Sequence, residues 1–335
     1  MRVNAIFIFI ISLLTIILLI GILSDTPQRA VYFFFIGPFR NLFSFGNMLN
    51  ASVPFILGAL GIITAMKAGS LNLGGEGQCY LGAFITTVTA LSLPHFGKAG
   101  IIICALAGSL SAGVLAGFSG YCKAKWNTSE LITSFLLSCA VIPVINYLVT
   151  GPFLDPGTSL ISTEKIHENM RFTQILRPSG LNTGFIIALV FVFIVKFFLD
   201  KTKTGYEFRM AGYNETFARY AGINVKINTV IAMTISGFLY GLAGSFAVFG
   251  THYAVIKEFS AGLGWSGLTA ALIAGFSPLA VIPGALFLAW INSGARIAMQ
   301  NTGLTFEIAY IVQAVIFFFS TSLVLKNIIA KKRKE

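Results

Sequence analysis

The chain has 335 residues, of which 56% are hydrophobic and only 10% charged, and its mean hydropathy is +0.83. A soluble domain needs far more charged surface, so these values exclude one and place the chain in a lipid bilayer. The formal net charge of +11 does not indicate a nucleic-acid-binding protein, because the basic residues stand in short gaps between apolar runs.

Nine apolar segments follow one another along the chain, and a transmembrane helix needs about 20 such residues. They cover residues 5–23, 49–66, 73–93, 99–122, 130–149, 181–199, 228–250, 265–295 and 306–325. Backbone inside lipid has to hydrogen-bond to itself, so each segment is expected to be helical. The first is longer than the core of a signal peptide and lacks a convincing cleavage site, so we expect it to remain as a helix.

The eighth segment is too long for one span, and Ser277-Pro278 within Gly275–Pro278 is a break signal. We therefore expect two helices there, of which the first is short and either spanning or re-entrant. The sequence thus predicts an all-α protein with one transmembrane domain over residues 1–335. This domain is a polytopic helical bundle of about ten spans, with one short or broken helix near Gly275–Pro278.

The loops predict the orientation of the bundle, because cytoplasmic loops are enriched in Lys and Arg. Residues 200–226, the turn 122–127 and the tail 331–334 are all basic, so we expect them on the cytoplasmic side. The long loop 150–180 balances acidic against basic residues and is expected to face outward. With a cytoplasmic N-terminus, ten spans return the basic tail to the cytoplasm, whereas nine would leave it outside.

The sequence contains none of the residue patterns that are typical of catalytic sites. The chain contains no GxxxxGK[ST] loop to hold phosphates, so we expect no ATP hydrolysis by this chain itself. It also contains no Ser/His/Asp, HExxH or paired-carboxylate pattern, so no catalytic residue is predicted. Cys79, Cys104, Cys122 and Cys139 stand in or beside apolar segments without a CxxC pair, so we interpret them as packing residues and predict no metal site.

The basic loop 200–226 contains a pattern typical of a short helix. Asn214 is a suitable N-cap, Glu215 suits the first turn, and Gly222 ends the helix. The residues on one face are Phe217, Tyr220 and Ala221. Such a helix fits a groove of a separate motor domain, but the same spacing also fits an interfacial helix anchored among lipid headgroups.

Residues 67–78 form a polar, glycine-rich stretch where the third apolar segment begins. A charged side chain inside a membrane costs about 2.5 to 3.5 kcal/mol, so Glu76 is expected to be paired or to face an aqueous path. We interpret the stretch as a gate or pathway element, with Asn72, Glu76 and Gln78 as its candidate residues. The alternative is a helix-packing turn that leaves Glu76 near the headgroups.

Other polar residues fall within or beside the apolar segments. Each of them either lines a pathway or hydrogen-bonds between helices. They are Glu130, Asn146, Asn292, Glu307 and Gln313.

Several stretches together carry a family resemblance. They are residues 67–78, 127–134, 151–157, 204–223 and 236–244. Through them, nearly the whole chain resembles the ABC-transporter permeases of the branched-chain amino acid, simple sugar and nucleoside superfamily. The similarity is greatest to the nucleoside-type branch, which works with basic-membrane-protein-like lipoproteins.

This resemblance implies a heteromeric importer in the bacterial cytoplasmic membrane, with both termini of this chain cytoplasmic. Its other parts would be a second similar permease, a cytoplasmic ATPase with tandem cassettes, and an extracytoplasmic binding lipoprotein. ATP and Mg²⁺ would bind only to the ATPase, so this chain would hold no cofactor. The implied cargo is a nucleoside, while riboflavin and simple sugars use closely similar permeases.

The resemblance also implies roles for two loops. Residues 212–222 would be the coupling helix, and loop 150–180 would help to receive the binding protein. The residues expected to couple the permease to the ATPase are Gly205, Gly212, Asn214, Glu215, Phe217, Arg219, Tyr220 and Gly222.

Two other classes of protein compete with this interpretation. A proton- or sodium-coupled secondary transporter would use Glu76 and Glu307 as coupling carboxylates and would transport without partners. A membrane-embedded enzyme would need clustered Asp, His or Arg at one membrane face, and the sequence has no such cluster.

Overall fold

The computed structural model describes residues 2–93, 96–305 and 307–332, and helices make up nearly all of its regular secondary structure. The α-helices are α1 (Arg2–Leu23), α2 (Pro27–Phe35), α3 (Leu42–Lys67), α4 (Gly75–Ser92), α5 (Gly97–Trp126), α6 (Glu130–Thr150), α7 (Thr183–Lys201), α8 (Lys203–Tyr213), α9 (Glu215–Tyr220), α10 (Val225–Ala247), α11 (Leu263–Ile273), α12 (Val281–Thr302) and α13 (Glu307–Lys332). Short helical turns are η1 (Gly37–Phe39), η3 (Glu168–Met170) and the π-helical η4 (Val248–His252).

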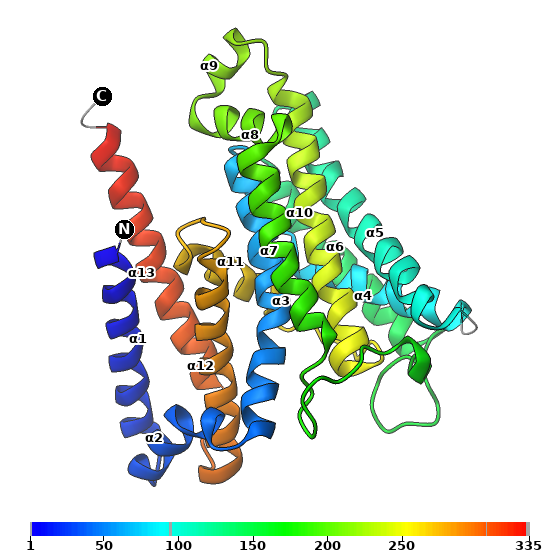
Figure 1. Cartoon of the computed structure of the whole chain (residues 1–335), viewed down its shortest axis with the longest axis vertical. Helices are drawn as coiled ribbons and strands as arrows, with labels where there is room; N and C mark the ends of the chain where they lie inside the picture. Colours follow the sequence, from blue (N-terminus) through cyan, green and yellow to red (C-terminus); the bar gives the residue numbers. More distant parts are fainter. Residues whose placement is uncertain (1, 94–95, 306, 333–335) are drawn as a thin grey trace.

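Figure 1 shows a bundle of long helices with α8 and α9 at one end and α2 at the other. Among the described residues, six helices are long and apolar enough to cross a membrane, namely α3, α5, α6, α7, α12 and α10 with η4. Shorter apolar helices cover residues 13–23, 263–273 and 307–319. These helices confirm the predicted all-α, multi-pass bundle.

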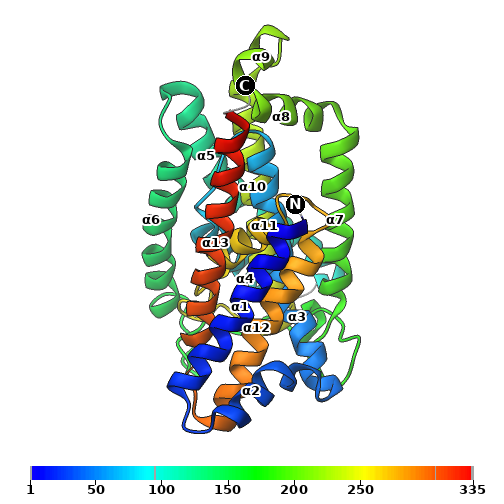
Figure 2. The ribbon, with the colours of Figure 1, turned by 90° about the vertical axis from the view of Figure 1, so that its left-hand side faces the viewer.

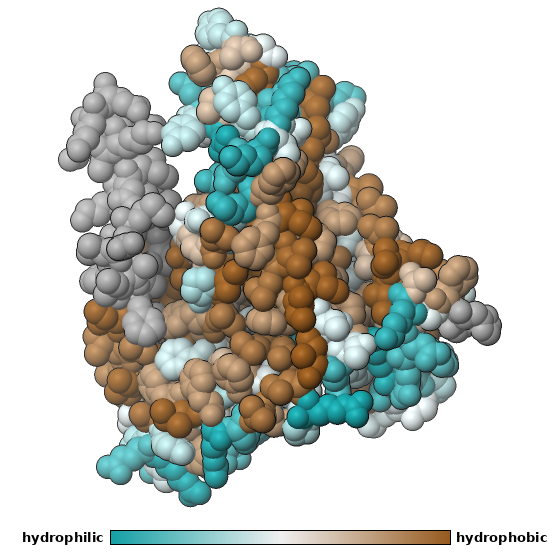
Figure 3. All heavy atoms as spheres, in the orientation of Figure 1, coloured by the Kyte–Doolittle hydropathy of each residue, from teal (hydrophilic) through white to brown (hydrophobic). Residues whose placement is uncertain are grey.

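The surface of the bundle suits a bilayer. Figure 3 shows hydrophobic residues over the middle of one face and hydrophilic residues at both ends of it. Figure 2 shows α6 and α7 on opposite sides of the bundle. Among the six long apolar helices, α3 is the most deeply buried and α6 the least, so α3 lies in the core and α6 at the periphery.

The core depends on small residues that let helices approach closely. A Cβ atom on Gly244 of α10 would lie 2.0 Å from the carbonyl oxygen of Cys79 in α4, and one on Gly237 would lie 2.4 Å from that of Ala112 in α5. Buried Cys79 fits the predicted packing role, as do Cys104 and Cys122, whereas Cys139 is exposed on α6.

The predicted break in the eighth apolar segment is confirmed. α11 ends at Ile273 and α12 begins at Val281. In the connection between these two helices, Gly275 and Phe276 both have positive φ. Other elements differ from the prediction, and α2 was not predicted at all. Residues 68–74 are not helical, so the third apolar segment becomes helical only at Gly75, and the loop 200–226 contains a further helix, α8.

The order of elements recurs in the two halves of the chain. Residues 2–92 and residues 183–273 contain the same order of elements. Each stretch begins with a helix and one or two short surface helices and continues with a long core helix and a non-helical segment. Each then ends with a shorter helix that begins inside the bundle, which we call a half-helix. The core helices α3 and α10 run in opposite directions, because the C-terminal end of α3 and the N-terminal end of α10 both contact α8. The two stretches therefore share an order of elements while their core helices run in opposite directions, although the sequence shows no strong internal repeat.

Candidate functional site

Two half-helices, α4 and α11, begin next to each other inside the bundle, about half-way between its two ends (Figure 1). A Cβ atom on Gly264 would lie only 2.3 Å from the backbone nitrogen of Glu76, so the first turns of the two helices touch. Each half-helix follows a non-helical segment, residues 68–74 before α4 and 253–262 before α11. We call this contact the half-helix junction.

The carboxylate of Glu76 connects the two helices. Its Oε1 accepts a hydrogen bond from the Gly262 N–H and its Oε2 accepts one from the Gly264 N–H, both at 2.8 Å. These donors lie at the start of α11, where backbone N–H groups otherwise lack partners, while Glu76 itself occupies the first turn of α4. The Glu76 carboxyl group therefore joins the N-terminal ends of both half-helices.

Asn72 and Gln78 form a reciprocal amide pair beside the junction. The Asn72 Nδ2 donates to Gln78 Oε1 at 2.7 Å, and the Gln78 Nε2 donates to Asn72 Oδ1 at 2.9 Å. Asn72 also donates to the hydroxyl of Ser236 in α10 and accepts from the N–H of Gly74. Both side chains are buried, and the pair holds segment 68–74 against α4 and α10.

Further helices contribute hydrogen bonds from small polar side chains. The hydroxyls of Ser134 and Ser138 in α6 accept from the backbone of Leu73 and Gly77. Tyr240 of α10 donates to the carbonyl of Gly264 at 3.1 Å. Sequence reasoning did not single these partners out, although residues 127–134 and 236–244 belong to the stretches that carry the family resemblance.

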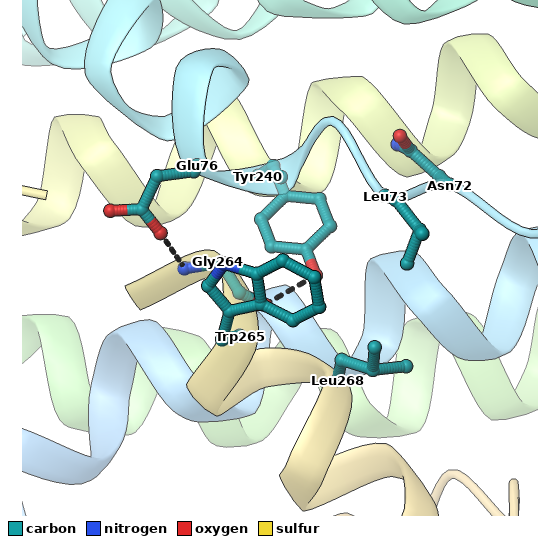
Figure 4. A pocket seen from close by; sticks show the side chains of 8 residues that line it. Asn72, Leu73, Glu76, Tyr240, Gly264, Trp265 and Leu268 are labelled. Atoms are coloured by element: carbon teal, nitrogen blue, oxygen red, sulfur yellow. Dashed lines mark hydrogen bonds between the residues drawn. The ribbon is translucent and has the colours of Figure 1, made fainter. Parts of the chain in front are cut away.

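A small cavity lies at the junction. Figure 4 shows its walls, and the lining residues are Asn72, Leu73, Gly75, Glu76, Tyr240, Gly264, Trp265 and Leu268. Its volume is about 10 Å³, which is roughly the space of one water molecule. The cavity of the closed junction is therefore too small for an organic solute.

The outward-predicted loop is hydrogen-bonded to the segment that leads into α11. The backbone N–H groups of Thr163, Ile166 and Phe172 donate to the carbonyls of Val255, Tyr253 and Phe249, at 2.8 to 3.0 Å. Asn182, at the end of the same loop, donates to the carbonyl of Gly250 and to Asn50 of α3. This loop and the start of α11 are thus one connected structure.

At the opposite end, α8 is held tightly against the bundle. Arg209 donates to the carbonyl of Leu199 in α7, and Glu207 accepts from Asn228 in α10 at 3.2 Å. Gly205 allows the sharp bend between α7 and α8, because a Cβ atom there would lie 2.1 Å from the carbonyl oxygen of Phe198.

Gly212, near the end of α8, contacts the turn that follows α3. A Cβ atom on Gly212 would lie 2.4 Å from the carbonyl oxygen of Lys67 and 3.0 Å from the nitrogen of Gly69. Gly69 has φ +74° and opens the segment that reaches Asn72 and α4. α8 therefore contacts the backbone at the start of the segment that leads to the half-helix junction.

The predicted short helix after Asn214 is present as α9. The Asn214 Oδ1 accepts from the N–H of Phe217 at 3.0 Å, which caps the N-terminus. Gly222 has φ +78° and follows the helix, and the N–H of Ile223 donates to the carbonyl of Ala218 at 3.0 Å. Together with the bond from Gly222 to Arg219, this is a Schellman motif.

One face of α9 presents aromatic side chains to the outside. Phe217 is 60% exposed and Tyr220 is 89% exposed, and the preceding Tyr213 is exposed as well, whereas Ala218 is fully buried. Glu215 and Arg219 form an ion pair of 2.5 Å along the helix. The predicted coupling residues thus lie together in α8 and α9, apart from the half-helix junction.

The other polar residues noted in the sequence have mostly structural partners. Glu130 pairs with Lys123 at 2.8 Å, and Asn146 accepts from the Tyr80 hydroxyl at 2.8 Å. Gln313 of α13 donates to the Ser266 hydroxyl of α11 at 3.1 Å. Asn292 donates to a carbonyl of its own helix.

The residues needed for the competing interpretations are not brought together in the described part of the chain. Glu307 is exposed at the start of α13 and does not line the cavity that Glu76 lines. Within the described residues, no group of three or more His, Cys, Asp or Glu side chains is placed to hold a metal ion. Of the predicted basic tail, residues 333 and 334 lie outside the described residues.

Comparison with known proteins identifies relatives over most of the chain. The family model described as "Branched-chain amino acid transport system / permease component" matches residues 44–321. The chain is 35% identical to a probable riboflavin import permease protein of Treponema pallidum, over 88% of this chain and 78% of that protein. It is 30% identical to a guanosine ABC transporter permease protein of Bacillus subtilis, over 89% and 87%.

A third relative is a nucleoside ABC transporter permease protein of Lactococcus lactis, which is 31% identical over 85% of this chain and 81% of that protein. A glucose ABC transporter permease protein of Haloferax volcanii is 25% identical over 89% and 81%. No solved structure matches the chain.

Proposed function

The chain belongs to the branched-chain amino acid transport system permease family, and on this premise we propose that it imports a nucleoside or a similar small ribosyl or ribityl solute. It is an ABC transporter permease, a transport subunit and not an enzyme. The proposed cargo is supported by three relatives that are at least 30% identical to this chain and are named for riboflavin, guanosine or nucleosides. The glucose permease is less similar, at 25% identity.

The importer contains further subunits in this proposal. They are a second homologous permease, a cytoplasmic ATPase with tandem cassettes that binds ATP and Mg²⁺, and an extracytoplasmic substrate-binding lipoprotein. Membrane lipid covers the remaining apolar surface. The exposed aromatic face of α9 supports the proposal of an ATPase partner, because the side chains of Phe217 and Tyr220 project from the helix and could insert into a groove of another subunit.

The proposed topology has ten crossings of the bacterial cytoplasmic membrane. Segment 68–74 with α4 and segment 253–262 with α11 each make one crossing, and α1, α3, α5, α6, α7, α10, α12 and α13 make the other eight. Both termini, α8 and α9 are then cytoplasmic, and the loop between α6 and α7 faces outward. The basic composition of residues 200–226 supports this orientation.

The half-helix junction serves as the gate in this proposal. The side chains of Asn72, Glu76 and Gln78 are fully engaged with protein groups, which favours holding the junction closed over binding cargo. Movement of α9 by the ATPase would reach α4 through the contact of Gly212 with Gly69. Movement of the outward loop by the lipoprotein would reach α11 through segment 249–256.

Uptake into proteoliposomes tests the proposal. Vesicles that hold this chain with its co-purified partners are given radiolabelled adenosine, riboflavin or ribose, with and without ATP and with the proton gradient collapsed. Uptake that needs ATP and the partners supports the importer, and the preferred label identifies the cargo. Uptake by this chain alone on a proton gradient would contradict it and favour a secondary transporter.

A further inference from the structure

Trp265 differs from the other residues that line the cavity of the half-helix junction. It is 42% exposed, whereas Tyr240, Gly264 and Leu268 are buried. Figure 4 shows its indole beside the Tyr240 ring and near the Glu76 carboxylate. The indole packs edge-on against Phe317 of α13, with ring centroids 6.4 Å apart, and much of its surface stays uncovered.

Trp265 does not lie at an end of the bundle, where a tryptophan at a membrane–water boundary would stand. Trp is enriched where a membrane meets water, because the ring is apolar and its N–H needs a partner. Trp265 stands at the start of α11, half-way along the bundle (Figure 1), and its indole N–H has no hydrogen bond to a described residue. By contrast, the indole of Trp290 donates to the carbonyl of Phe35 at 3.2 Å.

The polar atoms around Trp265 are already in use. The two Glu76 oxygens accept from Gly262 and Gly264, the Tyr240 hydroxyl donates to Gly264, and the Asn72 amide is bonded on both of its atoms. These bonds hold the closed junction together, and the indole is the most exposed of the lining side chains. The surface that the cavity offers to a solute is therefore the indole ring, with Leu73 and Leu268 beside it.

We propose that Trp265 is a specificity-determining residue, and that its indole stacks on the flat aromatic ring of a nucleobase or flavin as the cargo passes the half-helix junction. The indole N–H is then available to a carbonyl or ring nitrogen of the cargo. This inference rests on the proposed import function. It implies that the permease itself distinguishes an aromatic solute from a simple sugar, in addition to any selection by the binding lipoprotein.

The test uses the complete importer in proteoliposomes with Trp265→Leu and Trp265→Phe. Trp265→Leu keeps an apolar side chain without a ring, whereas Trp265→Phe keeps a ring. Since stacking on one aromatic side chain commonly changes binding by about tenfold or more, we expect Trp265→Leu to lower adenosine and riboflavin uptake about tenfold and Trp265→Phe to retain most of it. ATPase stimulation by the lipoprotein should persist in both variants.

The matched control is Trp290→Phe, which removes an indole outside the cavity and should leave the ranking of cargoes unchanged. Unaltered aromatic uptake in Trp265→Leu would overturn the inference, as would an equal loss in both Trp265 variants. Loss of the second permease from the purified Trp265→Leu complex would assign the residue to a subunit interface and overturn it too. If the unmodified importer takes up ribose alone, the inference fails while the importer mechanism stands, and if it takes up none of the three labels, the proposed function itself fails.

Discussion

The Glu76 carboxylate accepts a 2.8 Å hydrogen bond from the backbone N–H of Gly264, which lies 188 positions later in the chain. With the second bond from Gly262, this contact connects the start of α4 to the start of α11. Each half-helix is also connected to a different end of the bundle, α4 through Gly69 and Gly212, and α11 through the outward-predicted loop. At the junction, the segments that contact the two ends of the bundle are hydrogen-bonded to each other.

Replacement of Glu76 should destabilise this junction. A hydrogen bond contributes about 0.5 to 1.5 kcal/mol, so we expect Glu76→Ala, which loses both bonds, to lower the thermal unfolding temperature of the purified permease more than Glu76→Gln, which keeps one acceptor oxygen. Thermal unfolding in detergent compares the unfolding temperatures of the unmodified permease, Glu76→Gln and Glu76→Ala.

The control for the Glu76 variants is Glu307→Gln, at the exposed start of α13. It should change neither the unfolding temperature nor the uptake. An unfolding temperature of Glu76→Ala equal to that of the unmodified protein would contradict the structural role of the carboxylate. Loss of uptake in Glu307→Gln would instead favour the secondary transporter.

The exposed face of α9 should be needed for coupling but not for folding. We expect Phe217→Asp to abolish most of the lipoprotein-stimulated ATP hydrolysis and the uptake, because a charge on a 60% exposed knob prevents apolar docking without disturbing the core. Glu215→Ala removes only an exposed ion pair and should act in the same direction more weakly. ATP hydrolysis and uptake are measured on the same preparation.

Phe39→Asp is the matched control for the α9 variants, because Phe39 is an exposed phenylalanine of η1, which contacts α2 at the opposite end of the bundle (Figure 1). It should leave ATPase stimulation intact. Normal coupled transport by Phe217→Asp would remove the assignment of α9 as the coupling helix.

The contact of Gly212 with the turn after α3 should not tolerate a side chain. A Cβ atom 2.4 Å from the Lys67 carbonyl oxygen forces α8 away from α3, and overpacking of this kind costs about 1 to 3 kcal/mol. We expect Gly212→Ala to lower the unfolding temperature and to reduce uptake per ATP hydrolysed. Gly21→Ala is the control, since a Cβ atom there meets no atom within 4 Å, and equal behaviour of the two variants would contradict the close contact.

The Asn72–Gln78 pair should show energetic coupling. Each single change to alanine leaves buried groups of the other amide without partners, which costs about 1 to 3 kcal/mol, so the double variant should cost less than the sum of the two. A double-mutant cycle of unfolding free energies measures the difference. Asn301→Ala, an exposed asparagine bonded only within its own helix, serves as the reference, and additive costs for Asn72 and Gln78 would argue against the pair.

Much of the fold follows from local patterns in the sequence. The apolar segments predicted the long helices, Gly275–Pro278 predicted the break between α11 and α12, and Asn214 and Gly222 predicted the ends of α9. These features depend on residues within a few positions of one another, because helix formation, capping and chain breaks are determined by neighbouring backbone and side-chain groups. The short helices α2 and α8 were missed because neither has an apolar run long enough to predict a span.

The candidate site depends on tertiary structure. The sequence singled out Glu76 by the cost of a charge in a membrane, but its partners Gly262 and Gly264 carry no signal in the sequence, since any residue except proline supplies a backbone N–H. Tyr240 likewise looks like an ordinary apolar-segment residue until α10 is packed against α4 and α11. The sequence by itself determined which segments are helical, and the packing of helices distant in the chain decided which of their groups meet, because those contacts depend on helix positions that no local pattern encodes.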